Sequence, residues 1–366
     1  MAQNGLTGRV LDHDTRQPLP FANVFFVNTT KGVMTDEKGN FTFAQIPKGT
    51  SELVVSYIGY ETFYRRFEVD SLPSKLTVLL KMKAEALSEV KIKPHKDARW
   101  AEHYRLFEQT FLGKTLNAQQ CKILNPKALW FDDDPEKKVL TGGATEMLQI
   151  ENDALGYKLK YQLENFTYDY GQLYVSYAGY ATFEDIIPKN ERQANRWQQR
   201  RQDAYLGSVM HFMRALHRRT LKEEGFIVRK IVEDTLTKTA TMAKKTQILL
   251  PDTLRYRQFI GEHPPNRTML KFADLLQVTY TKAYEALEYR NQTSPSFGRF
   301  VDYSKKFQTS TAQLLASHVW VTPDGNYVNP IDLMMEGYWA WKKIADSLPL
   351  DYEPINATDA KLLTPR

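Results

Sequence analysis

The stretch Pro18-Leu19-Pro20-Phe21-Ala22-Asn23-Val24-Phe25-Phe26-Val27 decides the fold of the first part of the chain. Valine and phenylalanine favour extended backbone because branched and aromatic side chains pack well on a pleated surface, so residues 22–27 predict a strand. Proline lacks the N–H that a sheet needs. Pro18 and Pro20 both precede the strand, where a missing donor does no harm. The pattern therefore indicates β-structure rather than a helix.

Similar short runs surround this strand from Gly5 to Lys83. Strands are expected at residues 6–11, 22–27, 32–35, 40–43, 52–58, 61–69 and 75–80. Glycine at Lys38-Gly39 and at Ile58-Gly59 suits turns that need positive φ. Seven short strands at close spacing, without a helical period, predict a seven-stranded antiparallel β-sandwich within residues 1–83.

The same residues carry a resemblance to a known family. The shared elements stand in the family's order and spacing: Gly8-Arg9-Val10, Pro18 to Val24, Thr35-Asp36, Gly39-Asn40-Phe41 and Ser56 to Tyr60. Residues 5–83 resemble the carboxypeptidase regulatory-like domain, which implies a transthyretin-like sandwich. The resemblance also implies a Gram-negative cell envelope, where this domain often precedes TonB-dependent outer-membrane receptors. Nothing in the chain resembles a receptor barrel or plug, so transport is not implied.

Composition places the chain among ordinary globular proteins. Its 366 residues are 42% hydrophobic and 25% charged, and its net charge is +6. A nucleic-acid-binding protein would concentrate its positive charge in one patch, whereas the basic clusters here have acidic neighbours, so no nucleic-acid partner is expected. The single cysteine, Cys121, excludes an internal disulfide and a multi-cysteine zinc site.

The same resemblance implies an expectation about where in the cell the protein is located. No stretch approaches the ~18 apolar residues of a membrane helix, so no transmembrane segment is predicted. Met1 to Asn4 lacks the features of a signal peptide. We expect a periplasmic, outer-membrane-associated or cell-surface protein, from which a signal peptide was removed and to which Met1 was added.

The rest of the chain predicts an α+β fold that is mostly β. Residues 84–97 are charged and read as a linker, and residues 348–366 read as an extended tail. Between them, residues 98–347 predict a larger domain of antiparallel strands with about three helices. The helices are expected at residues 98–112, 190–224 and 331–347, with Gly225 ending the second. This region resembles the uncharacterised segment that follows the sandwich domain in such proteins, which implies architecture only.

Motifs for catalysis are missing from the sequence. A zinc carboxypeptidase uses His-x-x-Glu plus a distant histidine, and neither this motif nor His-Glu-x-x-His occurs, so no metal site and no cofactor are expected. Asp12, His13, Asp14 and Asp36 do not match a calcium loop, so turn chemistry is the better interpretation. Ser208 and His211 could touch on one helix, but a nucleophile also needs an orienting acid and an oxyanion hole.

Aromatic and basic side chains supply the candidate binding residues, because tryptophan, tyrosine and arginine dominate contact surfaces. One set steps along the predicted helix at residues 190–224, and a second gathers near the C-terminus. The candidates are Trp197, Arg201, Tyr205, Ser208 and His211 in the first set, and Trp320, Tyr338, Trp339 and Trp341 in the second. Aromatic stripes at this spacing are more often core than contact surface.

Together these observations predict a non-catalytic, exported cell-envelope protein. It would act as a binding or scaffold module for a protein partner or a glycan at the outer membrane. The alternative is a glycan- or peptide-cleaving hydrolase with an acid/base site in the second domain, since the separation of two carboxylates cannot be read from sequence.

Overall fold

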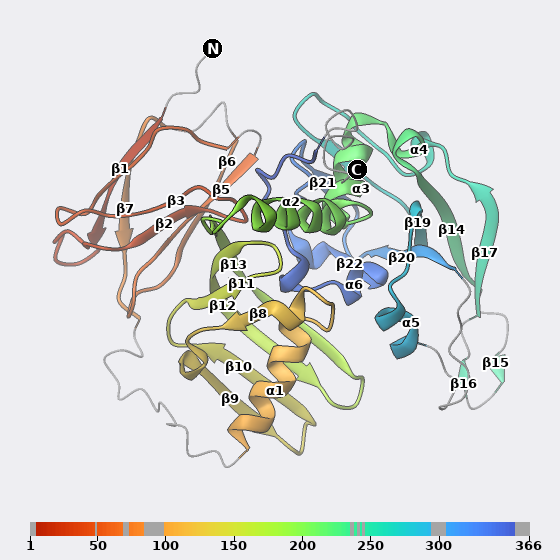
Figure 1. Cartoon of the computed structure of the whole chain (residues 1–366), viewed down its shortest axis with the longest axis horizontal. Helices are drawn as coiled ribbons and strands as arrows, with labels where there is room; N and C mark the ends of the chain where they lie inside the picture. Colours follow the sequence, from red (N-terminus) through yellow and green to blue (C-terminus); the bar gives the residue numbers. More distant parts are fainter. Residues whose placement is uncertain are drawn as a thin grey trace. The chain divides into compact units, whose positions relative to one another are not determined.

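The structure is a computed structural model that describes residues 5–47, 50–68, 73–83, 99–234, 238–239, 242–243, 246–293 and 305–355. The chain divides into two compact units (Figure 1). Unit 1 comprises Met1–Arg200 and Ile344–Arg366, and unit 2 comprises Arg201–Lys343. Among the helices of the described ranges, none is both long and apolar enough to cross a bilayer.

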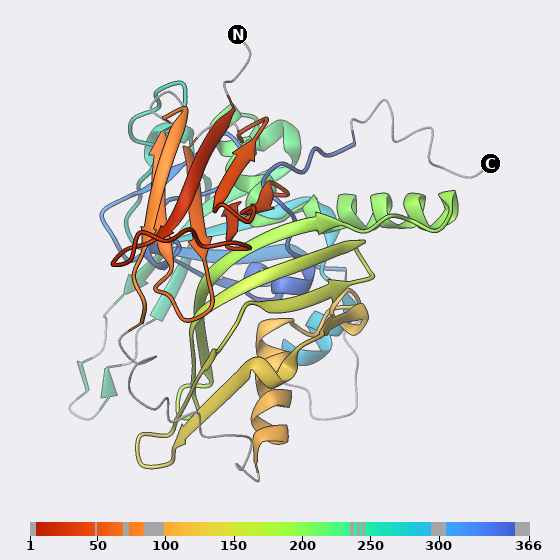
Figure 2. The same ribbon diagram turned by 90° about the vertical axis from the view of Figure 1, so that its left-hand side faces the viewer.

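Seven strands form the sandwich at the start of unit 1. They are β1 (Leu6–Asp12), β2 (Asn23–Phe26), β3 (Gly32–Met34), β4 (Asn40–Phe43), β5 (Thr50–Ser56), β6 (Phe63–Glu68) and β7 (Lys75–Leu80). One sheet has the order β4-β1-β7 and the other β3-β2-β5-β6. Figure 2 shows their strands in red to orange. The predicted seven-stranded sandwich is confirmed. One described pairing, β1 with β7, is parallel, which the sequence pattern did not indicate.

Buried and exposed residues alternate along the strands, and the buried ones form the core of the sandwich. In β1, Leu6 and Val10 are fully buried while Thr7 and Arg9 face solvent, as expected for a strand with one buried face. Phe26 of one sheet meets Phe43 of the other edge to face, with ring centroids 4.9 Å apart. The two sheets therefore close over one apolar layer.

The acidic side chains in the turns of the sandwich accept hydrogen bonds from backbone N–H groups. Asp36 accepts hydrogen bonds from the N–H groups of Lys38 and Asn40, and these bonds, the Asn40 one above all, lower the pKa of Asp36. Asp12 likewise accepts from Asp14 and Thr15. Within the part of the chain that the structure describes, no three His, Cys, Asp or Glu side chains gather to hold a metal ion.

A second sheet of unit 1 follows the sandwich. Its strands are β8 (Cys121–Ile123), β9 (Leu129–Asp134), β10 (Val139–Ala144), β11 (Leu148–Asn152), β12 (Tyr157–Asp169) and β13 (Tyr174–Asp185). The long strand β12 pairs with β11 near its start, with β10 near its end and with β13 along its whole length. Tyr157, Leu159 and Tyr161 are buried on one side, whereas Lys158 is exposed on the other. The alternation of apolar and polar residues from Tyr157 to Glu164 in the sequence is typical of such a half-buried strand.

Helix α1 (Trp100–Phe111) covers one face of this sheet with aromatic side chains (Figure 1). Phe107 and Phe111 are fully buried, as predicted for the helix at residues 98–112. Phe107 packs on Phe166 with centroids 4.9 Å apart, and Phe111 packs on Tyr161 at 5.0 Å. These ring contacts fix the helix on β12.

The chain returns to unit 1 after residue 343. The N–H of Ala345 donates to the carbonyl of Leu112, and the buried Asn152 amide donates to the carbonyl of Ala345. Asp346, in the 3-10 turn Ile344–Asp346, accepts from the Thr115 hydroxyl at 2.8 Å. Residues 98–347, predicted as one domain, are therefore shared between the two units, because residues 98–200 and 344–347 belong to unit 1. Residues 84–98, which hold the predicted linker, lie outside the described residues.

The described part of unit 2 contains a five-stranded sheet, two two-stranded sheets and helices. Its strands are β14 (Phe226–Asp234), β15 (Lys238–Thr239), β16 (Met242–Ala243), β17 (Thr246–Thr253), β18 (Thr268–Leu270), β19 (Leu275–Tyr284), β20 (Phe307–Leu314), β21 (Val319–Val321) and β22 (Leu333–Gly337). The main sheet has the order β17-β14-β19-β20-β22. Its apolar core is centred on Phe212, Phe226 and Val278.

The helix predicted at residues 190–224 is three helices. These are α2 (Glu191–Tyr205), within which the boundary between the units falls, α3 (Val209–Arg218) and α4 (Leu221–Glu224). The helical run breaks at Gly207, whose φ of +75° is not helical. Glycine suits this position because a Cβ atom would lie only 2.7 Å from the Tyr280 ring. Gly225, with φ +93°, caps α4 as predicted.

The helix predicted at residues 331–347 is wrong. Leu333 to Gly337 form β22, which pairs antiparallel with β20. Only the short α6 (Tyr338–Trp341) and the 3-10 turn Ile344–Asp346 are helical there. Sheet hydrogen bonds to β20 outweigh the helical preference of the Leu-Met-Met run, and Gly337 at φ +76° ends the strand. A further short helix, α5 (Leu287–Thr293), was not predicted.

Phe107→Ala should lower the free energy of unfolding by about 3–5 kcal/mol, because it leaves a cavity between α1 and β12. Gln109→Ala on the exposed side of the same helix is the matched control and should change stability by less than about 0.5 kcal/mol. Denaturant unfolding followed by circular dichroism measures both. Equal effects of the two variants would contradict the placement of α1.

Candidate functional site

An apolar contact joins the sandwich to the second sheet inside unit 1. Phe25, Val27 and Val54 form a small buried cluster, against which Met147 and Tyr180 pack. Phe25 is 1% exposed although it lies on the outer side of β2, away from the Phe26 ring. The sandwich is therefore covered on this side by the second sheet.

Main-chain hydrogen bonds reinforce the contact. The N–H of Asn28 donates to the carbonyl of Ala181 at 2.7 Å, and the N–H of Phe183 donates to the carbonyl of Thr29 at 2.9 Å. The loop after β2 thus adds a short parallel bridge, Thr29 with Thr182, to the edge of β13. Backbone pairing fixes register as well as distance, so the two sheets are held in one arrangement.

The C-terminal segment closes over the same loop. The N–H of Leu350 donates to the carbonyl of Asn28 at 2.6 Å. Asp351 accepts hydrogen bonds from the Thr30 N–H and from the Thr30 hydroxyl. Residues 348–355, the described part of the predicted tail, therefore dock on unit 1, and residues 356–366 lie outside the described residues.

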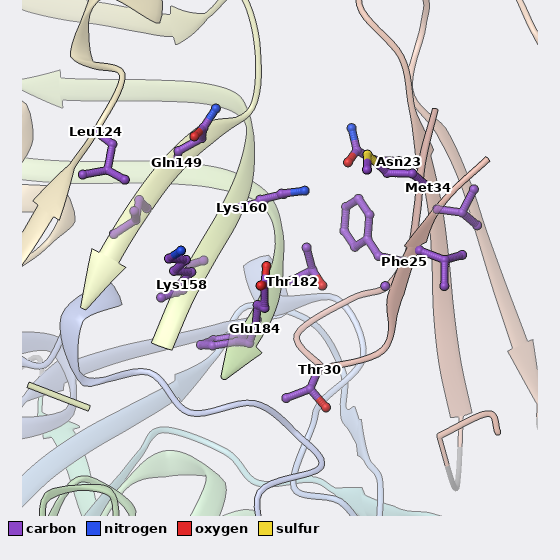
Figure 3. A pocket seen from close by; sticks show the side chains of 16 residues that line it. Asn23, Phe25, Thr30, Met34, Leu124, Gln149, Lys158, Lys160, Thr182 and Glu184 are labelled. Atoms are coloured by element: carbon purple, nitrogen blue, oxygen red, sulfur yellow. The ribbon is translucent and has the colours of Figure 1, made fainter. Parts of the chain in front are cut away.

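A pocket of about 320 Å³ lies between the sandwich and the second sheet. Strands β2 and β3 with Thr30 form one wall, and β11, β12, β13 and Leu124 form the other (Figure 3). Lys160 extends from β12 toward Asn23 and Phe25 of β2 (Figure 3). This site lies where two rigid elements meet, a preferred place for ligands.

Register across the second sheet arranges the polar groups of the pocket in two rows. Gln149, Lys160 and Thr182 lie opposite one another on β11, β12 and β13. The next row places Lys158 between Glu151 and Glu184. Opposite charges therefore flank Lys158 on both sides, whereas neutral side chains flank Lys160.

Some polar groups of the pocket are already engaged within the protein. The hydroxyl of Thr30 donates to Asp351, and that of Thr182 donates to the Thr29 carbonyl. By contrast, the side chains of Asn23, Gln149 and Lys160 have no hydrogen bond or ion pair to any described residue.

The apolar lining differs between floor and rim. Phe25 is 1% exposed and its ring forms the floor, whereas the Phe183 ring lies on the other face of the second sheet, against Tyr157. Met34 and Leu124 are 57% and 50% exposed and stand at the rim. The described lining holds one carboxylate, Glu184, and no histidine, cysteine or serine. The arrangement suits binding through lysine, amide and apolar contacts.

The first set of predicted binding residues does not form one surface. Trp197 is buried and donates from Nε1 to the Asp153 carbonyl within unit 1. Tyr205, in unit 2, is also buried, and its ring packs on His211 with centroids 4.7 Å apart. Arg201 is half-buried at the start of unit 2. Trp197 and Tyr205 are therefore core residues of different units.

Ser208 and His211 contact each other through a helix cap. The Ser208 hydroxyl accepts from the backbone N–H of His211 as the N-cap of α3. The Gly207 N–H donates to Nδ1 of His211, so Nε2 carries the proton and donates to Glu224 at 2.7 Å. Both ring nitrogens are used, and the histidine does not act as a base for Ser208 in this geometry.

The second set is largely core as well. Tyr338 and Trp339 are buried, and the Trp339 Nε1 donates to the Gly207 carbonyl. Trp341 is half-buried and donates to Gln292, while Trp320 is half-buried beneath the Arg267 guanidinium, 4.1 Å from its ring centre. Indole N–H groups and ring faces that are used inside the protein stabilise the fold and leave little surface for a ligand.

The pocket residues were not among those singled out in the sequence. Alternation along residues 157–168 places Lys158 and Lys160 on the polar side of their strand. This is the feature of the sequence that could have indicated them as pocket residues. Nothing local indicates that the sandwich covers this side, because the contact joins residues more than a hundred positions apart, such as Ser56 and Gln162.

Residues 6–92 match the family model of the CarboxypepD_reg-like domain, which confirms the resemblance of residues 5–83. No curated protein is significantly similar to the chain.

Three solved structures give partial alignments. A type II cohesin–X-dockerin complex from Acetivibrio cellulolyticus is 17% identical over 31% of this chain and 76% of its own, with a TM-score of 0.19. A protein from Bacteroides uniformis described as carbohydrate-binding is 10% identical over 50% and 80%, with a TM-score of 0.19. A 9R-lipoxygenase from Cyanothece is 11% identical over 58% and 48%, with a TM-score of 0.16. TM-scores this low establish neither a shared fold nor a shared function.

Substitution of Ser208 tests its role as the N-cap of α3. Ser208→Ala should lower stability by about 1 kcal/mol because the first turn of α3 loses its acceptor. Ser208→Asp should keep most of that stability, since aspartate also caps and suits the positive end of the helix. Thermal unfolding of the two variants measures the difference. Equal stability of the alanine and aspartate variants would show that the cap contributes nothing.

Three histidines make unit 2 sensitive to acid. Burial lowers the pKa of His211, His217 and His263 from the ordinary value of 6.5, although the Glu224 carboxylate partly opposes this at His211. The unfolded chain therefore binds protons before the folded one does, and stability falls as pH drops below about 6.5. The melting temperature should be lower at pH 5.5 than at pH 7.5. His217→Gln should flatten this dependence, and an unchanged slope would contradict the assignment.

Proposed function

We propose that this chain is a non-catalytic binding protein of the cell envelope that holds a protein partner or a glycan in the pocket between its sandwich and its second sheet. The sandwich would act as a scaffold and supply one wall of the site. The observation that carries this proposal is the pocket itself, which polar side chains without a partner among the described residues enter from two joined sheets.

Preorganisation supports a binding role. The walls are fixed by backbone hydrogen bonds from the loop after β2 to β13 and by the docked C-terminal segment. A ligand therefore does not have to order the site, and less binding energy is spent on conformational entropy. Asn23, Gln149 and Lys160 supply donors and acceptors that no described residue uses.

The chemistry of the lining favours binding over cleavage. Glycoside hydrolysis uses two carboxylates that flank the scissile bond, whereas the described lining offers Glu184 alone. One histidine–carboxylate pair, His211 with Glu224, lies in unit 2, where His211 is buried and its Nδ1 accepts from the Gly207 N–H. These features support a protein that holds its ligand unchanged.

An envelope location is part of the proposal. It is supported by the match of residues 6–92 to the CarboxypepD_reg-like domain, because the resemblance described in the sequence analysis implies a Gram-negative cell envelope. We expect the protein expressed from its natural gene to fractionate with the periplasm or the outer membrane. Recovery in the cytosolic fraction alone would contradict this part of the proposal.

A charge reversal in the pocket tests the binding role. Lys160→Glu should weaken capture of the natural partner from envelope extracts by about tenfold or more, since a charge-assisted hydrogen bond is worth ~1.5–3 kcal/mol. Lys75→Glu on β7 is the matched control, because it makes the same charge change on the other sheet of the sandwich. Quantitative mass spectrometry of material retained by immobilised protein measures the three samples. Identical retention by all three would contradict a role for the pocket.

A further inference from the structure

Lys160 differs from Lys158, the other lysine of the pocket, in its cross-strand neighbours, because Lys158 lies between the carboxylates Glu151 and Glu184. Lys160 is half-buried, its cross-strand neighbours Gln149 and Thr182 are neutral, and no described residue pairs with its ammonium group. Removing a charge from water is costly unless an opposite charge replaces the lost hydration. An anion in the pocket would supply that compensation.

Two amides are placed to complete an anion site. Asn23 lies on the sandwich wall and Gln149 on the opposite wall, beside Lys160 in the cross-strand row (Figure 3). Both side chains carry N–H donors that no described residue uses. A carboxylate has two oxygens and can accept from the ammonium group and from an amide together. The Lys160 environment therefore fits a carboxylate better than a neutral group.

The apolar lining distinguishes a peptide from a glycan. Sugar rings are bound by stacking on exposed aromatic faces, but Phe25 is buried and the Phe183 ring lies on the other face of the second sheet. The exposed apolar side chains are Met34 and Leu124, at the rim on opposite walls. Flexible aliphatic side chains of this kind adapt well to the apolar side chains of a peptide.

We infer that the pocket takes a peptide segment of a partner protein in which a carboxylate side chain stands next to an apolar one. The carboxylate binds the Lys160 ammonium group and the amides of Asn23 and Gln149, and the apolar side chain lies between Met34 and Leu124. This inference rests on the proposed function and names the class of its ligand.

Selection from a random peptide library displayed on phage tests the inference. The immobilised full chain should enrich peptides with aspartate or glutamate beside an apolar residue. Lys160→Gln should lose the acidic preference. Lys160→Glu should enrich lysine- and arginine-containing peptides instead, while Lys75→Glu should select as the unchanged protein does. A misfolded variant would lose peptide selection and would not exchange a preference for acidic peptides for one for basic peptides. The Lys160→Glu variant therefore keeps the test decisive.

A second measurement separates the inference from the proposed function. Calorimetry with a glucuronic-acid oligosaccharide should show no binding to the unchanged protein. Binding of this sugar that Lys160→Gln abolishes would overturn the peptide assignment and leave the binding function standing. Peptides selected without acidic preference, or no enriched peptide at all, would also overturn the inference. If, in addition, the unchanged protein retained no partner from envelope extracts, both the inference and the proposed function would be overturned.

Discussion

The two main-chain hydrogen bonds between the loop after β2 and the edge of β13 are the constraint on which unit 1 depends. Asn28 donates to Ala181, and Phe183 donates to the carbonyl of Thr29. Because backbone groups have fixed spacing, these bonds set how the sandwich meets the second sheet to within one residue. They thereby also place Lys160 and Gln149 on the opposite wall of the pocket from Asn23.

Local patterns in the sequence were enough to predict the sandwich and the second sheet. Alternation from Tyr157 to Leu163 predicts one buried side of β12, and the aromatic spacing at Phe107 and Phe111 predicts the buried side of α1. Such signals arise within a few residues, so tertiary contacts seldom overrule them when the period is clear. The turn at Asp36 is predictable for the same reason, since its hydrogen bonds reach only to Asn40.

Features that depend on distant partners were not predictable. The helical run through residues 190–224 breaks at Gly207, where the backbone passes close to Tyr280. The segment at Leu333 becomes a strand because β20 offers an unpaired edge. The tryptophans that pattern alone suggests for a contact surface are instead held inside the units, by the carbonyls of Asp153 and Gly207. The pocket needs the docking of two sheets, which no single stretch of sequence encodes.

The return of the C-terminal segment has a consequence for biosynthesis. Ala345 and Asp351 complete contacts with Leu112, Asn152 and Thr30, so unit 2 is an insertion within unit 1. As the polypeptide leaves the ribosome, the sandwich and the second sheet emerge first, but their last contacts wait until all of unit 2 has been synthesised. Since domains tend to fold in the order in which they appear, unit 2 has to fold while unit 1 is still incomplete.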